Sequence, residues 1–233
     1  MCFAVRRARP ILAAVAGDLP ESVPGASPVG DFVRRMFDLA VACVALIVLG
    51  PFMLIIARRI RRDSPGPAVF RQTRAGRGMR PFTLYKFRTM RPETDPYGPS
   101  PHDAADPRLT RIGRWLREHS LDELPQLWNV LRGDMTLVGP RPLYVEQACS
   151  WTKRQALRLR VKPGLTGLAQ VSGRAGLTIE DKLELDVEYV LRRSLRLDAF
   201  ILARTLARLW RGGDIYEVRY SRDEERRGDV SPR

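Results

Sequence analysis

The stretch LAVACVALIVLGPFMLIIA, residues 39–57, decides the fold of this chain. It carries no charged side chain, and its length is close to the roughly 20 apolar residues that a helix needs to cross a membrane. A buried helix of a soluble protein is the alternative for any apolar run, but so long a run without a charge favours membrane insertion. We therefore predict a membrane helix over residues 31–62.

Two features of this segment argue against a straight span. Pro51 follows Gly50 near its middle, and a proline removes a backbone donor and clashes with the preceding turn, so the helix should bend or break there. Both flanks are also basic, with Arg34, Arg35, Arg58, Arg59, Arg61 and Arg62. The positive-inside rule then places both ends in the cytoplasm, which a re-entrant helix satisfies. A kinked ordinary span with one basic flank outside is the alternative, and the residues alone leave both open.

The composition of the 233 residues narrows the function. Forty Lys and Arg against 26 Asp and Glu give a net charge of +14, which favours polyanionic partners such as nucleic acid, anionic lipid headgroups or phosphate-bearing substrates. A membrane-tethered polyanion-binding protein without enzymatic activity is one candidate. No nucleic-acid motif is present, so we expect no nucleic-acid partner. The three cysteines are far apart, and only His102 and His119 are available, so any chemistry must depend on carboxylates and arginines.

The rest of the chain is predicted to form a single domain with an α/β fold, mostly helical with a small β-hairpin. Residues 1–30 are expected to be a disordered tail, 63–211 a compact cytoplasmic catalytic domain, and 212–233 a polar C-terminal tail. Short strands at 68–70 and 82–87 flank a Gly/Arg turn. Basic amphipathic helices over 108–120 and 195–210 either lie on the membrane surface or cover the core, and residues 178–193 form an acidic helix.

The densest signal for chemistry is HSLDELPQLWNVLRGDMTLVGPRP, residues 119–142. Asp122 and Glu123 are adjacent carboxylates, and Ser120 and Glu123 have the spacing of a capping box, but a helix capped at Ser120 would place Pro125 too deep. A helix start at Leu121 or Asp122 removes the conflict. An ionised Asp can be a nucleophile for phosphoryl groups, and a neighbouring carboxylate can hold a divalent metal, for which Mg²⁺ is best suited.

Several cations near this pair are candidates for binding phosphate. Two prolines, Pro140 and Pro142, fix the backbone on either side of Arg141, whose guanidinium suits bidentate contact with a phosphate. A structural turn is the alternative for this tetrapeptide. Further cations occur in the Lys86-Phe87-Arg88 block and at Arg174, although solvated surface charge is the default for each.

Six ordered blocks make the chain resemble the bacterial sugar transferase family, the monotopic polyprenyl-phosphate phosphoglycosyl transferases, over residues 34–210. The blocks are RRMFDLA with the apolar segment that follows it, SPGPAVFRQTRAG, FTLYKFRTM, DPRLTRIGRWLREHSLDELPQLWNVLRGDMTLVGPRP, VKPGLTGLAQVSGR and LELDVEYV. The resemblance implies a re-entrant membrane helix broken at Pro51, with the active site at the cytoplasmic face of the bacterial inner membrane. Here Gly50 stands where the family usually has Ser.

The resemblance also implies roles for individual residues. Asp122 matches the nucleophile and Glu123 the residue that helps to bind Mg²⁺. Lys86, Arg88, Arg117, Arg141 and Arg174 match the cations expected to bind substrate phosphates. The implied reaction moves a sugar 1-phosphate from a UDP-sugar to a polyprenyl phosphate, releases UMP, and initiates a lipid-linked glycan such as an exopolysaccharide. A conventional glycosyltransferase, which would release UDP, is the nearest alternative.

Overall fold

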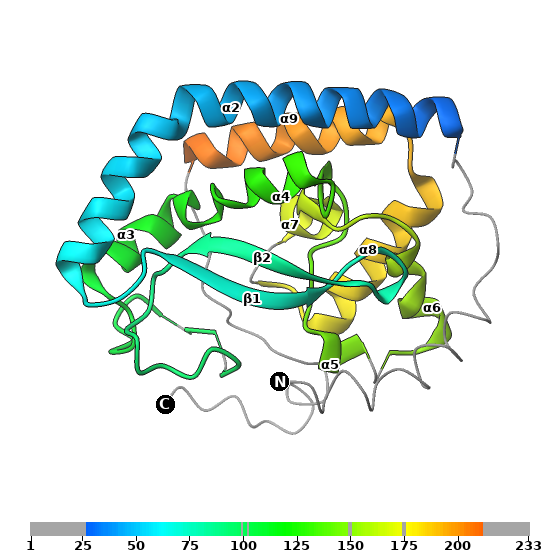
Figure 1. Cartoon of the computed structure of the whole chain (residues 1–233). Helices are drawn as coiled ribbons and strands as arrows, with labels where there is room; N and C mark the ends of the chain where they lie inside the picture. Colours follow the sequence, from blue (N-terminus) through cyan, green and yellow to red (C-terminus); the bar gives the residue numbers. More distant parts are fainter. Residues whose placement is uncertain (1–26, 99, 102, 149–150, 174–175, 212–233) are drawn as a thin grey trace.

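The computed structural model describes residues 27–98, 100–101, 103–148, 151–173 and 176–211 (Figure 1). Nearly all of the two tails predicted from the sequence lies outside these residues. The described part is mostly helical with two small sheets, which confirms the predicted mostly helical fold with a small hairpin. In chain order its elements are α2 Pro28–Asp63, β1 Val69–Ala75, η1 Arg77–Met79, β2 Pro81–Phe87, α3 Arg111–Glu118, η2 Leu121–Glu123, α4 Gln126–Arg132, β3 Thr136–Val138, α5 Val145–Ala148, α6 Lys153–Ala156, η3 Leu157–Arg160, β4 Gly164–Thr166, α7 Leu168–Ser172, α8 Ile179–Arg192 and α9 Leu195–Arg211.

The apolar stretch forms a single bent helix, α2. Ser27 caps its N-terminus by accepting a hydrogen bond from Gly30 N, and Pro28 fills the first turn, where its missing N–H is not needed. The helix turns through a marked bend about midway along its length (Figure 1), and Pro51 lies inside it. The bend was predicted, but the helical conformation continues through Gly50 and Pro51 rather than breaking there.

The burial of α2 is that of a membrane-associated helix. Its most apolar 18-residue window has a mean hydropathy of 2.9, and only 11% of that window is buried within the protein. The core helix of a soluble protein would be mostly buried, so that alternative does not fit. The exposed large side chains of α2 include Phe32, Phe37, Val44, Ile47, Val48, Phe52, Leu54 and Ile55.

One side of α2 nevertheless packs against the domain at both ends. Ala42, in the first half, lies in the central core with Val130 and Ile201. Ile56 and Ile60, in the second half, belong to a separate cluster with Phe87 and Leu116. The helix is therefore anchored on the domain on both sides of its bend.

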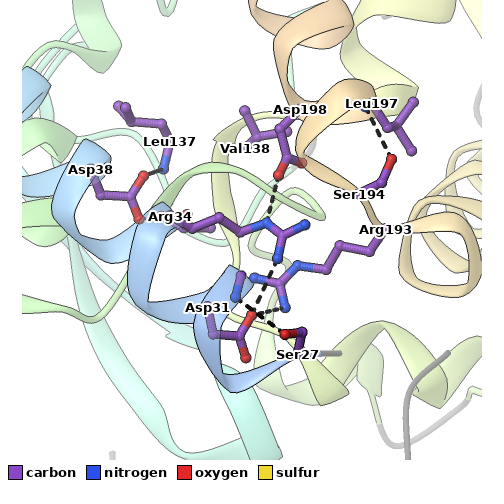
Figure 2. Close-up of polar contacts among 12 residues, drawn as sticks. Ser27, Asp31, Arg34, Asp38, Leu137, Val138, Arg193, Ser194, Leu197 and Asp198 are labelled. Atoms are coloured by element: carbon purple, nitrogen blue, oxygen red, sulfur yellow. Dashed lines mark hydrogen bonds and ion pairs between the residues drawn. The ribbon is translucent and has the colours of Figure 1, made fainter. Parts of the chain in front are cut away.

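The arginines at the N-terminal flank of α2 bind inside the protein. Arg34 is 8% exposed, and its Nε donates to Asp198 Oδ2 of α9 at 2.6 Å (Figure 2). The guanidinium of Arg35 donates to the carbonyls of Val130 and Leu131 at 2.6 and 2.8 Å, which caps the C-terminal end of α4. These two cations therefore fix α2 to the domain. The exposed basic residues are those of the other flank, Arg58, Arg59, Arg61 and Arg62.

The predicted hairpin is confirmed, with a longer first strand than expected. β1 and β2 pair antiparallel from Val69 opposite Phe87 to Ala75 opposite Pro81. The turn between them contains Gly78 at a φ of +63°, a conformation that glycine adopts without the usual steric cost. The hairpin carries Lys86 at its open end.

A parallel pair of short strands, which the sequence did not predict, brings two distant blocks together. Thr136 of β3 lies opposite Gly164 of β4, and Val138 lies opposite Thr166. The backbones lie so close at the start of β4 that a Cβ added at Gly164 would lie 2.0 Å from the backbone nitrogen of Gly139, the residue after β3. Glycine is therefore required at this junction, which positions the segment Pro140-Arg141-Pro142.

The three longer helices predicted outside the membrane segment are present. In α3, Leu116 is fully buried while Trp115 is 40% exposed, and in α9, Ile201 faces the core while Phe200 and Leu206 are 49% and 62% exposed. α9 thus presents apolar side chains both to the core and to the outside, and it runs alongside the first half of α2 (Figure 1). The acidic helix α8 turns one carboxylate, Asp186, into the interior.

Candidate active site

The acidic pair lies in a short 3₁₀ turn, η2, between α3 and α4. Ser120 adopts a left-handed conformation at a φ of 55°, and its side chain makes no capping hydrogen bond to the turn. The turn begins at Leu121, as the position of Pro125 predicted. Pro125 itself occupies the N-cap position of α4, where its missing N–H costs no helical hydrogen bond. The short turn between the two helices thereby fixes Asp122 and Glu123 at one point in the structure.

Asp122 is a buried carboxylate surrounded by cations. It is 8% exposed. Burial raises its pKa to about 6, the neighbouring charge of Glu123 adds to the rise, and Lys86, Arg117 and Arg141 oppose it. Three of the cations predicted from the sequence therefore lie close enough to influence this one carboxylate. Above pH 6 Asp122 is an anion in a poorly solvated site, a state suited to attack on phosphorus.

Lys86 comes to Asp122 from the end of the hairpin. Its pKa is lowered to about 8, mainly by burial and also by nearby Arg117, while Asp122 opposes the fall. Phe70 lies opposite Lys86 in the hairpin, and the Lys86 Nζ lies 5.2 Å from the centre of the Phe70 ring. The hairpin register thus places one poorly hydrated ammonium group beside the acidic pair.

Arg141 reaches the second carboxylate. Its Nη2 lies 2.9 Å from Glu123 Oε1, and the two side chains are 54% and 22% exposed. Pro140 and Pro142 on either side are buried, so the backbone of this segment is held in place while the guanidinium stays accessible. A phosphate that enters from solvent could therefore contact the Arg141 guanidinium.

The structure does not bring Arg88, another of the predicted cations, to this point. Arg88 is 6% exposed, and its guanidinium donates to the carbonyls of Ser64 and Pro65, at the end of α2. β2 ends at Phe87, so the alternation of side chains that directs Lys86 toward Asp122 stops before Arg88. Arg174 lies outside the described residues.

One cation beside the site was missed from the sequence. Arg74 of β1 lies 3.7 Å over the ring of Tyr144 and donates to Gln72 Oε1 at 2.6 Å. Burial lowers its pKa to about 10, and its charge acts on Lys86. Had the first strand been extended to Ala75, two-residue alternation would have put Arg74 on the same face as Phe70.

Replacing Arg88 and replacing Lys86 should have different effects on the free energy of unfolding. Arg88→Met should lower the free energy of unfolding by about 2 kcal/mol or more, because buried hydrogen bonds from a charged donor are lost and carbonyls at the end of α2 lose their partner. Lys86→Met should leave it close to wild type, since burial already disfavours the charge. Chemical denaturation of both purified variants measures this, and equal losses would contradict the assignment.

The acidic pair also determines what metal the site suits. Among the described residues, no group of three or more His, Cys, Asp and Glu side chains gathers around one point. Two adjacent carboxylates, one of them 22% exposed, match a Mg²⁺ ion that takes one or two protein carboxylates and completes its shell with water and substrate oxygens. A zinc or calcium site built wholly from protein ligands does not fit these residues.

Comparison with known proteins gives matches over most of the chain. The model of the family described as "Bacterial sugar transferase" matches residues 29–212. The "Uncharacterized sugar transferase EpsL" of Bacillus subtilis (strain 168) is 45% identical over 177 residues, covering 76% of this chain and 87% of that protein. The "UDP-glucose:undecaprenyl-phosphate glucose-1-phosphate transferase" of Caulobacter vibrioides is 42% identical over 187 residues, covering 77% and 70%.

A third relative carries the name of a different sugar. The "UDP-N-acetylgalactosamine-undecaprenyl-phosphate N-acetylgalactosaminephosphotransferase" of Aeromonas hydrophila is 38% identical over 192 residues, covering 80% of this chain and 45% of that protein. The matched residues include the acidic pair and the segment around Arg141 within the family match. Relatives of comparable similarity are thus named for different sugars.

Proposed function

This chain belongs to the bacterial sugar transferase family, and on that premise we propose that it transfers a sugar 1-phosphate from a UDP-sugar to undecaprenyl phosphate, with release of UMP. The observation that carries the proposal is Asp122, a buried carboxylate faced by Lys86, Arg117 and Arg141. Relatives named for this class of reaction, with either glucose or N-acetylgalactosamine, support the assignment. The product would be the first lipid-linked intermediate of an exopolysaccharide or a related glycan.

The proposed chemistry takes two displacements at one phosphorus. A carboxylate oxygen of Asp122 attacks the phosphorus that bears the sugar, the bond to the bridging oxygen breaks, and UMP leaves with that oxygen. A phosphate oxygen of the polyprenyl phosphate then attacks the same phosphorus, and the bond to Asp122 breaks. The carboxylate is regenerated and the polyprenyl diphosphosugar is formed. Two anionic substrates then need not occupy the site together.

The surrounding cations supply the electrostatic part of this chemistry. Both substrates carry phosphates, and the negative charge on the oxygens around phosphorus must be stabilised as the bond breaks. Lys86 and Arg117 act on Asp122 directly, and Arg141 pairs with Glu123 while more than half of its side chain is exposed to solvent, from which a phosphate would enter. Because Lys86 and Asp122 are poorly solvated, their interaction with substrate charge is stronger than it would be in water.

Mg²⁺ is the proposed cofactor. Glu123, with Asp122 beside it, would hold the ion, and its bound form would neutralise phosphate charge and orient the donor. In the structure Arg141 pairs with the Glu123 carboxylate. Arg141 therefore balances the charge of Glu123 and limits the positions that this carboxylate can take.

We further propose that α2 enters the cytoplasmic membrane as a re-entrant helix, with both of its ends and the active site at the cytoplasmic face. The bend about midway along α2, the exposed apolar side chains and the exposed arginines after it support this topology. The outward apolar side chains of α9, Phe200 and Leu206, would lie at the membrane surface. The site would then sit where the phosphate of the lipid emerges.

The nucleotide product tests the proposed reaction. Protein purified in detergent would be incubated with Mg²⁺, undecaprenyl phosphate and a panel of UDP-sugars, and the released nucleotide identified by chromatography. UMP with one donor supports phosphosugar transfer and names the sugar. UDP would point to a conventional glycosyltransferase, and no nucleotide with any donor would favour a polyanion-binding protein.

The pH dependence of UMP release should show two limbs. Activity should fall below pH 6, because Asp122, whose pKa is raised to about 6, becomes protonated and is no longer a nucleophilic carboxylate. It should fall again above pH 8, as Lys86 loses its proton. The UMP burst should be measured without lipid acceptor. The diphosphate diester of a UDP-sugar has no ionisation in this range, so the pH dependence then reports on ionisable groups of the enzyme.

A conservative variant tests whether Lys86 is the group that produces the alkaline limb. Arginine stays protonated throughout this pH range, so Lys86→Arg should move the alkaline limb upward and leave the acid limb in place. An alkaline limb that stays at the same pH in this variant would show that Lys86 is not the group responsible.

A further inference from the structure

An ion pair beneath the site takes no part in the proposed chemistry. Arg158 of η3 and Asp186 of α8 are each 3% exposed at the side chain, and the Arg158 guanidinium bonds the Asp186 carboxylate. The guanidinium also lies 4.8 Å over the ring of Trp151. Two charges so deeply buried are costly to desolvate, and replacing such pairs with apolar side chains is often neutral for stability. Stability alone therefore does not account for this pair.

The buried pair is bound to the backbone of Arg141. Nη2 of Arg158 donates to the carbonyl oxygen of Arg141 at 2.5 Å. Burial raises the pKa of Asp186 to about 6, and Arg158 and the backbone N–H of Arg141 oppose that rise. Both polar groups of the Arg141 backbone thus face the two buried charges. Pro140 and Pro142 have no N–H, so the Arg141 N–H is the only backbone donor of this tripeptide.

The side chain of Arg141, by contrast, lies largely in solvent. It is 54% exposed, and its guanidinium reaches Glu123 from the fixed backbone. For so exposed a side chain, the position of the Cα and the direction of the Cα–Cβ bond determine which atoms the guanidinium can reach. A shift of the backbone by about 1 Å is enough to cost an enzyme about 100-fold in rate.

We propose that Arg158 and Asp186 are positioning residues, which hold the backbone of Arg141 so that its guanidinium is directed at Glu123 and the donor phosphates. The expected effect on catalysis rests on the proposed function, whereas the contact with the Arg141 backbone is independent of it. Arg158 and Asp186 come from segments after the acidic pair in the chain, and both contact the backbone of Arg141.

The test replaces both charges while keeping the volume. In the double variant Arg158→Met/Asp186→Leu the space is filled and both partners of the Arg141 backbone are removed. The expected result is a folded protein in which kcat/KM for UMP release falls about 100-fold. The matched control is Arg154→Gln/Glu184→Gln, an exposed ion pair between α6 and the same helix α8, which does not contact Arg141 and should leave UMP release within about twofold.

A double-mutant cycle distinguishes positioning from general damage. In an Arg141→Ala background, removing the buried pair should cost little more, because its effect passes through the missing guanidinium. An additive loss in that background, or UMP release within about twofold of wild type in the Arg158→Met/Asp186→Leu protein, overturns the proposal. Should the double variant fail to fold, Asp186→Asn takes its place, since it keeps the shape and an acceptor oxygen and removes the charge.

Hydrogen exchange tests the backbone contact without any assay of activity. A peptide that begins at Gly139 and ends at Leu143 reports on Arg141 with little background, because its two prolines carry no amide. The Arg141 amide should be protected in the wild-type protein and exchange at least about tenfold faster in the double variant. Rapid exchange of the Arg141 amide in the wild-type protein would contradict the positioning proposal even if UMP is released. A protected amide in a protein that releases no UMP would leave the contact intact and contradict the proposed function instead.

Discussion

Replacing Asp122 with Asn should abolish UMP release while leaving the protein folded and bound to membranes. The amide has nearly the same size as the carboxylate but is not a nucleophile, so loss of the covalent route should cost roughly 10⁴-fold or more in turnover. The variant should be at least as stable as wild type, because burial disfavours the charged carboxylate of Asp122. Nucleotide release, thermal unfolding and membrane fractionation measure the three properties.

Intact mass spectrometry gives a direct readout of the same residue. Wild-type protein incubated with a UDP-sugar and no lipid acceptor should gain the mass of a sugar phosphate, and Asp122→Asn should not. Asp122→Ala serves as a second variant that deamidation cannot restore to Asp. Asp134→Asn, at the other end of α4, is the matched control and should keep its activity. A fully active Asp122→Asn protein would refute the assignment of the nucleophile.

Gly164→Ala should be strongly destabilising although it adds a single methyl group. The added Cβ would lie 2.0 Å from Gly139 N, 2.5 Å from Thr166 O and 2.6 Å from Gly139 Cα, and all three are backbone atoms that cannot rotate away. Overpacking of this kind costs about 3 kcal/mol, and β3 and β4 must separate to relieve it. Gly164 N also donates to Pro140 O at 2.9 Å, so the segment that holds Arg141 should move as well.

The matched control for this change is Gly176→Ala. An added Cβ at Gly176 meets no atom within 4 Å, so its free energy of unfolding should stay within about 0.5 kcal/mol of wild type. Denaturant titrations of the two variants compare them directly. Equal stability of Gly164→Ala and Gly176→Ala would mean that the backbones of β3 and β4 are not in contact as described.

The helices and the hairpin were predictable because their signals are local. Apolar residues recur at helical spacing in α3 and α9, and an uninterrupted apolar run marks α2. Pro125 excluded a helix that begins at Ser120, and the structure places the start of the turn at Leu121. The parallel pairing of β3 with β4 was not predictable, because each strand has only three residues and no periodicity develops over so short a length.

The cations of the site were predicted only in part. Lys86, Arg117 and Arg141 do face Asp122, whereas Arg88 is bound to the end of α2. Arginines look alike in sequence whether they bind substrate or carbonyl groups of the protein. The same ambiguity applied to Arg34 and Arg35, which read as membrane flanks and instead fix α2 to α9 and α4.

By itself the sequence determined the membrane-associated helix, the family and the acidic pair, because each is encoded in a continuous run of residues. Only the tertiary structure decided which cations act on Asp122 and what holds Arg141 in place. Those answers depend on where β2 ends, on close backbone contact at Gly164, and on a bond from Arg158 to a carbonyl 17 residues away. Such contacts join segments that are distant in the sequence, and a local sequence pattern does not indicate which distant residue a side chain will contact.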